Sequence, residues 1–194
     1  GQRDEADRRA GKKPFCVVAT VGTTSFTSVD PVEQIAEVAE KYGLWMHIDA
    51  AYAGAAAILP ERAWIFKGAE RAHSLSMNPH KWLLTPSDLS AFFTRRPDLL
   101  RRAFTLVPEY LRTEQDEAAV NLMDYSLAMG RRFRILKLWF VMRYYGRQVV
   151  MEILRRHLAL GQRAAAAVDA DPRFERVAPV HFGLVCFRYR GSDE

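Results

Sequence analysis

Two residues with complementary chemistry lie in the first half of the chain. Lys81 is part of the segment SMNPHKWLL (76–84), and Asp49 is part of HIDAAYAG (47–54). A lysine amine can form a Schiff base with a carbonyl carbon, and a fixed carboxylate can keep a pyridine nitrogen protonated so that the ring accepts electrons. These are the two groups that pyridoxal phosphate chemistry requires.

Each residue also has an ordinary structural interpretation. Lys81 could extend its ammonium to water along its own methylenes from the edge of an apolar segment. Asp49 could cap the turn that follows its strand. The pairing favours a functional role, because both residues are expected at strand ends and open α/β sheets bind their ligands at the carboxyl ends of their strands.

The segments before Asp49 predict a βαβ unit. A buried strand is expected over 14–22 and a second strand over 44–49, each β-branched or apolar. Between them, residues 31–43 predict a helix with Asp30 as N-cap and Gly43 as its end. Such a connection is right-handed and makes the two strands parallel.

Two further strands are expected over 72–78 and 89–95, with Lys81 in the connection between them. The polar stretch 104–130 predicts a long loop, and loops of this length in compact proteins are often functional. After it, two helices joined near Gly146 are expected, and then strands over 173–179 and 182–190.

These elements predict an α/β fold with a mostly parallel sheet and flanking helices. We expect residues 1–130 to form the later part of a large domain, including the loop at about 104–130. Residues 131–194 would then be linking helices and an incomplete small α+β domain. The chain begins with glycine and stops soon after a strand-like run, which indicates a piece of a longer protein.

Composition argues against several classes of function. The 194 residues are 49% hydrophobic and 26% charged, which is typical of a soluble globular protein. The net charge is +5, but the basic residues are scattered, so nucleic-acid binding is not expected. No apolar run reaches the roughly 18 to 20 residues of a membrane helix. Cys16 and Cys186 each lie in an apolar run, which predicts small buried side chains and favours a reducing cytoplasm.

Four blocks of sequence carry a resemblance to a known family. They are VATVGTTSFTSVDP, WMHIDAAYAGAAAILPE, NPHKWLL and GRRFRILKLWFV. In this order they resemble the pyridoxal-phosphate-dependent aromatic-L-amino-acid decarboxylases (group II amino acid decarboxylases), from about residue 2 to the end. The resemblance implies the large domain of the aspartate-aminotransferase-like fold. It also implies decarboxylation of an aromatic L-amino acid to an amine, in a homodimer with a shared active site.

The resemblance also implies roles for individual residues. Lys81 would hold pyridoxal 5'-phosphate as a Schiff base, Asp49 would contact the pyridine nitrogen, and Ala51 would lie against the ring. The remaining cofactor neighbours would be Thr24, Asn78 and His80, with His80 and Trp82 lining the seat of Lys81. Thr24 and Asn78 could instead serve their turns. His80 could move protons or only position Lys81. No metal site is expected.

Tyr110, in LVPEYLRT, matches the tyrosine of the family's catalytic loop. Without the resemblance, a single tyrosine in a polar loop is more typical of a surface anchor. In the family this tyrosine protonates the α-carbon after carbon dioxide leaves, and relatives with phenylalanine there tend to form aldehydes by oxidative deamination. Tyrosine at this position therefore favours simple decarboxylation.

Two alternatives to the aromatic decarboxylase stay open from the sequence. The first is a decarboxylase of an acidic amino acid (glutamate, aspartate or a sulfinate), because the upstream part of family members supplies most of the substrate pocket. The second is a non-catalytic scaffold with the same fold. Family members are more than twice this length, and the missing part supplies much of the phosphate cup. We therefore expect the chain by itself to be inactive.

Overall fold

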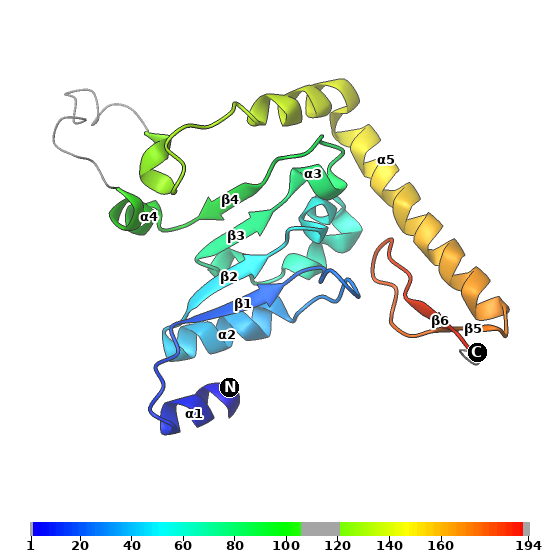
Figure 1. Ribbon diagram of the computed structural model, residues 1–194, viewed down its shortest axis with the longest axis horizontal. Coiled ribbons are helices and arrows are strands. Elements are labelled where there is room, and N and C mark those ends of the chain that lie inside the picture. The colour runs from blue at the N-terminus through cyan, green and yellow to red at the C-terminus, as the bar shows by residue number, and fades with distance from the viewer. Residues whose placement is uncertain (1, 106–120, 192–194) are drawn as a thin grey trace.

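The computed structural model describes residues 2–105 and 121–191, and among these the side chains of residues 2–4 and 8 are not described (Figure 1). Helices and strands alternate in the first half of the chain and a long helix dominates the second. The first elements are α1 (Gln2–Arg9), β1 (Cys16–Thr20), α2 (Val32–Tyr42), β2 (Trp45–Asp49) and the 3-10 helices η1 (Ala53–Ile58), η2 (Pro60–Phe66) and η3 (Ala69–Arg71). They are followed by β3 (Ser74–Met77), α3 (Pro79–Trp82), β4 (Ala91–Thr94), α4 (Pro97–Phe104), η5 (Leu122–Tyr125), α5 (Ile135–Ala170), β5 (Phe174–Arg176) and β6 (Phe187–Tyr189).

The four strands β1 to β4 form one sheet in sequence order. The first three are parallel, with Thr20 opposite Asp49 and Asp49 opposite Ser76, while β4 runs antiparallel to β3. This confirms the predicted parallel βαβ unit and the mostly parallel α/β sheet. Because the carboxyl ends of parallel strands share one edge, the residues that follow β1, β2 and β3 meet there.

Helix α2 ends as the sequence predicts but begins differently. Gly43 adopts φ 64° at the C-cap, and its N–H bonds to helix carbonyls. The prediction of Asp30 as N-cap is wrong, because the N-cap position is Pro31 and no side chain caps the helix. Asp30 Oδ2 instead accepts a hydrogen bond from the Thr20 amide at 2.8 Å. The carboxylate therefore fastens the loop before α2 to the end of β1.

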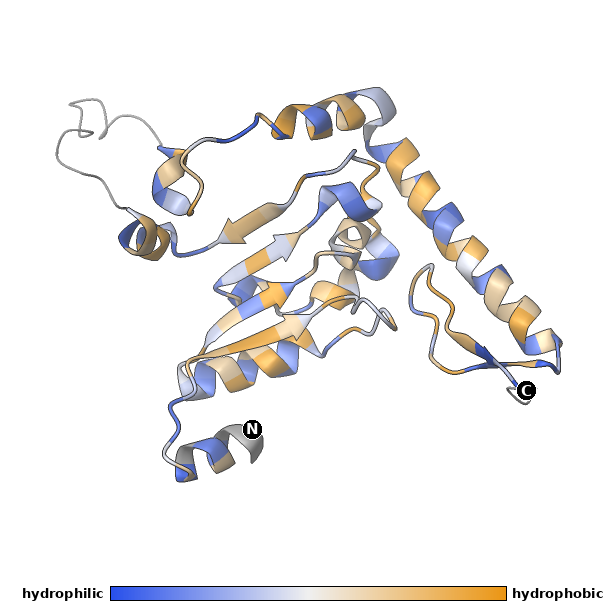
Figure 2. Cartoon of the chain, viewed as in Figure 1, coloured by the Kyte–Doolittle hydropathy of each residue, from blue (hydrophilic) through white to orange (hydrophobic). Residues whose placement is uncertain are grey.

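The two faces of the sheet differ in burial. Side chains toward α2 and η1, such as Ala19, Met46 and Ile48, are fully buried. On the other face Val18 is 50% exposed, and Cys16 is exposed as well. The expectation of a buried strand over 14–22 thus holds for one face only, because β1 is an edge strand whose side chains alternate between faces. Figure 2 shows that hydrophobic residues concentrate in the strands and in the helices that pack on them.

The two cysteines are not the buried side chains that the sequence predicts. Cys16 is exposed at the start of the edge strand β1, and Cys186 is half-buried. The Cys186 thiol donates to the carbonyl oxygen of Ser25 at 3.1 Å. Both are free thiols, and the second one attaches the C-terminal segment to the loop after β1.

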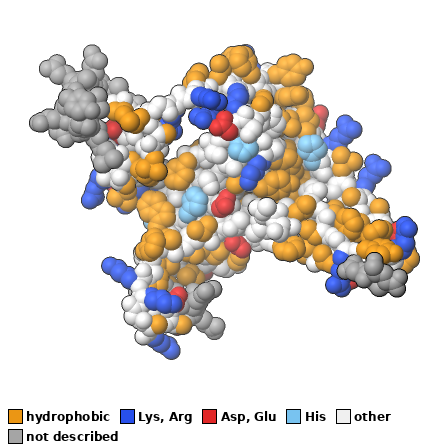
Figure 3. All heavy atoms as spheres, viewed as in Figure 1, with side chains coloured by type: hydrophobic (Ala, Val, Ile, Leu, Met, Phe, Trp, Pro, Cys, Tyr) orange, Lys and Arg blue, Asp and Glu red, His pale blue; other side chains and the backbone are white. Residues whose placement is uncertain are grey.

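Helix α5 consists of two helical segments joined at Gly146, as predicted, because Gly146 has non-helical dihedral angles (φ 69°, ψ 170°). The segment after Gly146 contributes to the same core as the sheet, through Val150, Met151, Leu154 and Leu158. The segment before Gly146 exposes an apolar surface, visible along the top of Figure 3. Its large exposed side chains are Ile135, Leu136, Trp139, Phe140, Tyr144 and Tyr145.

The C-terminal strands β5 and β6 form a separate two-stranded antiparallel sheet. Both lie inside the predicted ranges but are shorter than expected. Within the part of the chain that the structure describes, no helix combines the length and apolar character needed to cross a membrane.

Candidate active site

Lys81 lies on α3, a single helical turn that directly follows β3 and has Pro79 at its first position. Proline fits there because its fixed φ suits a helix start and no N–H is needed. The Lys81 side chain is exposed at the wall of a cavity of about 310 Å³. The other residues of this wall are Thr23, Thr24, Thr27, Tyr52, Gly183 and Leu184. Among the residues that the structure describes, no carboxylate lies within ion-pair distance of Lys81 Nζ.

Three successive hydrogen bonds lead from Asp49 to Lys81. Asp49 Oδ1 accepts from the Ala51 amide at 3.0 Å. The Ala51 carbonyl accepts from the Asn78 amide at 3.1 Å, and the Asn78 carbonyl accepts from the Lys81 amide at 2.9 Å. The turns that carry the carboxylate and the amine are therefore held to each other through the backbone.

His80 and Trp82, on either side of Lys81, face other parts of the protein. His80 Nδ1 accepts a hydrogen bond from the Leu89 amide at 2.8 Å, which directs the ring toward the loop before β4. Trp82 is 6% exposed, and its Nε1 donates to His157 Nδ1 at 3.1 Å. Neither residue is among those that line the Lys81 cavity in the described part of the chain, so the expectation that they line its seat stays a prediction. They anchor the single turn that presents Lys81.

The loop after β1 supplies hydroxyl groups to the same cavity. Gly22 begins it with φ 87°, and a Cβ there would lie 2.7 Å from the Ala53 Cβ, so only glycine allows this close approach. Thr23 Oγ1 accepts from the Ser28 amide at 3.0 Å, which closes the loop. Thr24 follows in the cavity wall.

Thr27 is unusual within this loop. It is 3% exposed and has φ 53°, a region that β-branched residues rarely adopt. Its buried Oγ1 has no hydrogen-bond partner among the described residues. Because buried hydroxyls are almost always paired, one that lacks a partner among the described residues, in the wall that also holds Lys81, fits a wall that binds a polar group. The residues present therefore suit a cofactor with a carbonyl group and several polar atoms.

The structure brings only some of the expected site residues into one wall. Lys81 and Thr24 share the cavity, whereas Asp49 is connected to Lys81 through a series of hydrogen bonds that begins at its carboxylate and continues through the backbone of Ala51 and Asn78. Tyr110 lies outside the described residues. Sequence reasoning missed Thr23, Thr27, Tyr52, Gly183 and Leu184. The first three could have been found, because they stand in the segments VATVGTTSFTSVDP and HIDAAYAG with Thr24 and Asp49, but Gly183 and Leu184 carry no such signal.

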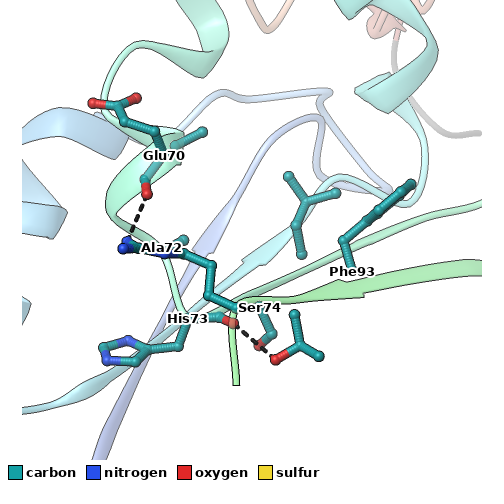
Figure 4. A pocket seen from close by; sticks show the side chains of 9 residues that line it. Glu70, Ala72, His73, Ser74 and Phe93 are labelled. Atoms are coloured by element: carbon teal, nitrogen blue, oxygen red, sulfur yellow. Dashed lines mark hydrogen bonds between the residues drawn. The ribbon is translucent and has the colours of Figure 1, made fainter. Parts of the chain in front are cut away.

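A second hollow, of about 300 Å³, lies at the opposite end of β3 (Figure 4). Arg95 Nη1 donates to the Glu70 carbonyl at 2.7 Å, and Thr94 Oγ1 donates to the His73 carbonyl at 3.1 Å. The His73 ring stacks on Trp45, and its Nδ1 accepts from the Met46 amide. These polar groups are used in joining β2, β3 and β4, so this hollow is structural.

Comparison with known proteins decides the family. Residues 3–190 match the family model described as the pyridoxal-dependent decarboxylase conserved domain. The chain belongs to this family. A tryptophan decarboxylase of Camptotheca acuminata is 45% identical over 97% of this decarboxylase-family chain, and an aromatic-L-amino-acid decarboxylase of Mus musculus is 44% identical over 98%. The chain spans about two fifths of the length of these relatives, 39% and 40% respectively.

The fold of this chain matches that of solved decarboxylase structures. The crystal structure of Oryza sativa TDC with PLP and tryptamine superimposes with a TM-score of 0.93 at 44% identity, covering 97% of this chain and 39% of that chain. The α/β fold with a mostly parallel sheet is thus confirmed as that of the pyridoxal-dependent decarboxylases. Among the described residues of this decarboxylase-family chain, no three histidine, cysteine or acidic side chains gather as a metal site would require.

Proposed function

We propose that the protein containing this chain decarboxylates an aromatic L-amino acid to the corresponding amine and carbon dioxide, with pyridoxal phosphate as cofactor. One observation carries the proposal. Lys81, which has no ion-pair partner among the described residues, lies in a cavity wall with Thr24 and is fixed through the backbone to the carboxylate-bearing turn of Asp49. The names of the relatives support an aromatic substrate, since those proteins act on tryptophan or on aromatic amino acids.

Pyridoxal phosphate, when bound, supplies a carbonyl group for a lysine amine and a ring that accepts electrons from a breaking bond. In this chain Lys81 Nζ is the proposed point of covalent attachment. The Asp49 carboxylate keeps a proton at the ring nitrogen, and a single fixed charge acts more strongly in a dry site than in water. Thr24 contributes a hydroxyl to the cofactor from the cavity wall.

The remaining residues act mainly by orientation. Ala51 offers a small side chain, so that a flat ring can lie against the turn after β2. Asn78 joins the two turns through its amide and carbonyl. His80 positions Lys81, because its Nδ1 is engaged by the Leu89 amide. This geometry favours positioning over proton transfer for His80.

Proton delivery to the α-carbon is proposed for Tyr110, on the strength of its place in the segment LVPEYLRT. A tyrosine there supports decarboxylation over aldehyde formation. We also propose a homodimer that shares its active site. The apolar surface of α5 before Gly146, which includes Trp139 and Phe140 at 53% and 58% exposure, supports an extensive subunit contact.

Two further assignments belong to the same proposal. Residues 1–130 are the later part of the cofactor-binding large domain, and residues 131–194 are linking helices and the start of the small domain. A cytoplasmic location is supported by the two free thiols, Cys16 and Cys186.

An absorbance titration of the whole protein with pyridoxal phosphate tests the function. We expect a visible band from the lysine-linked cofactor that is absent in Lys81→Ala. Lys41→Ala, which removes an exposed lysine in the last turn of α2, should retain the band. Release of amines from tryptophan, tyrosine and dihydroxyphenylalanine should exceed release from glutamate, aspartate and cysteine sulfinate. If glutamate, aspartate or cysteine sulfinate is turned over preferentially, the substrate is an acidic amino acid and not an aromatic one. If the folded protein shows no band, it is a non-catalytic scaffold.

A further inference from the structure

Three aromatic side chains from distant parts of the chain pack together beside the Lys81 cavity. The rings of Tyr52 and Trp82 are parallel, with centroids 5.1 Å apart and an interplanar angle of 7°. Phe182 meets both rings edge-on, at 6.1 Å from Tyr52 and 5.7 Å from Trp82. Offset-stacked and edge-to-face pairs are the arrangements that aromatic quadrupoles favour. We call these three residues the aromatic cluster.

The aromatic cluster connects three segments that each reach the cavity. Trp82 adjoins Lys81 on α3, Tyr52 follows Asp49 in the turn after β2, and Phe182 precedes Gly183 and Leu184 in the C-terminal segment. Phe182 is 1% exposed, so the C-terminal segment is firmly inserted at this point. The cavity wall is therefore assembled from parts that no single element supplies.

Tyr52 differs from the other two members because it lies in the cavity wall itself. Its ring also packs against the start of the loop after β1, since a Cβ at Gly22 would come within 3.1 Å of Tyr52 Cδ1. Its hydroxyl lies beside Gly183, because a Cβ built on Gly183 would lie 3.9 Å from the hydroxyl oxygen. Burial raises the pKa of the phenol, and a hydrogen bond with the Gly183 backbone opposes that rise. Phenylalanine would serve a purely apolar role equally well, so the hydroxyl indicates a specific task.

We propose that Tyr52 is a positioning residue of the Lys81 site. Its ring supports the turn that presents Lys81, and its hydroxyl holds the C-terminal segment, with Gly183 and Leu184, against the cavity. The expected effect on kcat rests on the proposed function. The expected effects on hydrogen exchange and on the labelling of Lys81 can be measured without any reaction.

Two substitutions separate the ring from the hydroxyl. Tyr52→Phe keeps the stack on Trp82 and removes the hydroxyl that lies beside the Gly183 backbone, whereas Tyr52→Leu removes both. Tyr42→Phe is the matched control, because the Tyr42 hydroxyl donates to Glu5 Oε1 at 2.6 Å on the exposed side of α2. Leu154→Ala is a second control that creates a cavity in the core without removing a member of the aromatic cluster.

Hydrogen exchange of the whole protein tests the hydroxyl. Amides of residues 182–184 should exchange about 3- to 10-fold faster in Tyr52→Phe, the range expected for one lost hydrogen bond. Tyr42→Phe should leave their exchange unchanged. Unchanged exchange in Tyr52→Phe would overturn the role of the hydroxyl.

Chemical labelling and kinetics test the ring. In Tyr52→Leu, the rate at which an amine-selective reagent labels Lys81 in cofactor-free protein should change at least about 3-fold. The kcat of this variant should fall about 100-fold with KM nearly unchanged, because misplaced reacting groups slow the reaction. Tyr52→Phe should restore both values, and Leu154→Ala should alter neither despite a lower Tm. If Tyr52→Leu and Leu154→Ala lose the same amount of Tm and also show the same kcat and the same labelling of Lys81, the proposal is overturned. If the wild-type protein releases no amine, the proposed function fails, while exchange and labelling still decide the role of Tyr52.

Discussion

The amide of Asn78 donates a hydrogen bond to the carbonyl oxygen of Ala51 at 3.1 Å. This bond fastens the turn after β3 to the turn after β2, and hence the lysine-bearing turn to the carboxylate-bearing turn. Both atoms belong to the backbone, so the link depends on the register of two parallel strands and not on side-chain identity. A fixed separation of two reacting groups is what a preorganised site requires.

Asp49→Asn should lower kcat about 100- to 1000-fold, the range for removing one preorganised electrostatic contact. The asparagine oxygen can still accept the hydrogen bond that Asp49 Oδ1 takes from the Ala51 amide, so Tm should change little. Steady-state kinetics and thermal unfolding measure both effects. Asp30→Asn, which alters a carboxylate bonded to the Thr20 amide, is the control and should retain kcat. A kcat within 3-fold of wild type in Asp49→Asn, about 0.7 kcal/mol in activation free energy, would refute the role of the charge.

Thr27→Val should raise the free energy of unfolding of the cofactor-free protein by about 1 kcal/mol, because it removes a buried hydroxyl that lacks a partner among the described residues. Valine keeps the β-branched shape at φ 53°, so the backbone strain is the same in both proteins. Thr85→Val is the opposite control. Thr85 is also buried, but its Oγ1 donates to the Leu83 carbonyl at 3.2 Å, so its loss should destabilise. Urea unfolding that shows equal destabilisation by both substitutions would mean that the Thr27 hydroxyl is paired in the whole protein.

Gly161→Ala should destabilise the protein by about 1 to 3 kcal/mol through overpacking. A Cβ at Gly161 on α5 would lie 2.8 Å from the Phe182 carbonyl oxygen and 3.0 Å from the Gly183 Cα, both backbone atoms. Gly130→Ala is the control, since a Cβ there meets nothing within 4 Å, and it should change stability by less than about 0.5 kcal/mol. Chemical unfolding of the two variants gives the comparison. Equal stability of the two would show that the C-terminal segment can shift away from α5 at little cost.

Glu61→Gln should remove an acid-sensitive contribution to Tm. The Arg155 guanidinium, whose Nε lies 2.7 Å from Glu61 Oε1, lowers the pKa of this carboxyl from 4.5 to about 2. A carboxyl with a lowered folded-state pKa stabilises the fold above its unfolded pKa and loses that effect as pH falls through the folded value. The excess Tm of wild type over Glu61→Gln should therefore be constant above about pH 5 and shrink from there toward pH 2. Differential scanning calorimetry across this window checks it, and an excess that persists at pH 2 would contradict the assignment.

Much of the fold could be predicted from the sequence because its signals are local. The strand–helix–strand order before Asp49, the helix end at Gly43 and the break at Gly146 follow from residue periodicity and from the freedom of glycine. The same holds for Lys81 in the connection between β3 and β4. These features depend on neighbours within a few residues, so they are visible without the tertiary structure.

The composition of the cavity wall was decided by the tertiary structure alone. Gly183 and Leu184 reach Lys81 from about a hundred residues away, because Phe182 packs on Tyr52 and Trp82. Likewise, the local pattern predicted Asp30 as an N-cap, but its carboxylate accepts a hydrogen bond from the Thr20 amide at the end of β1. Such contacts depend on how distant segments pack against one another, and the spacing of residues along the chain carries no record of that packing.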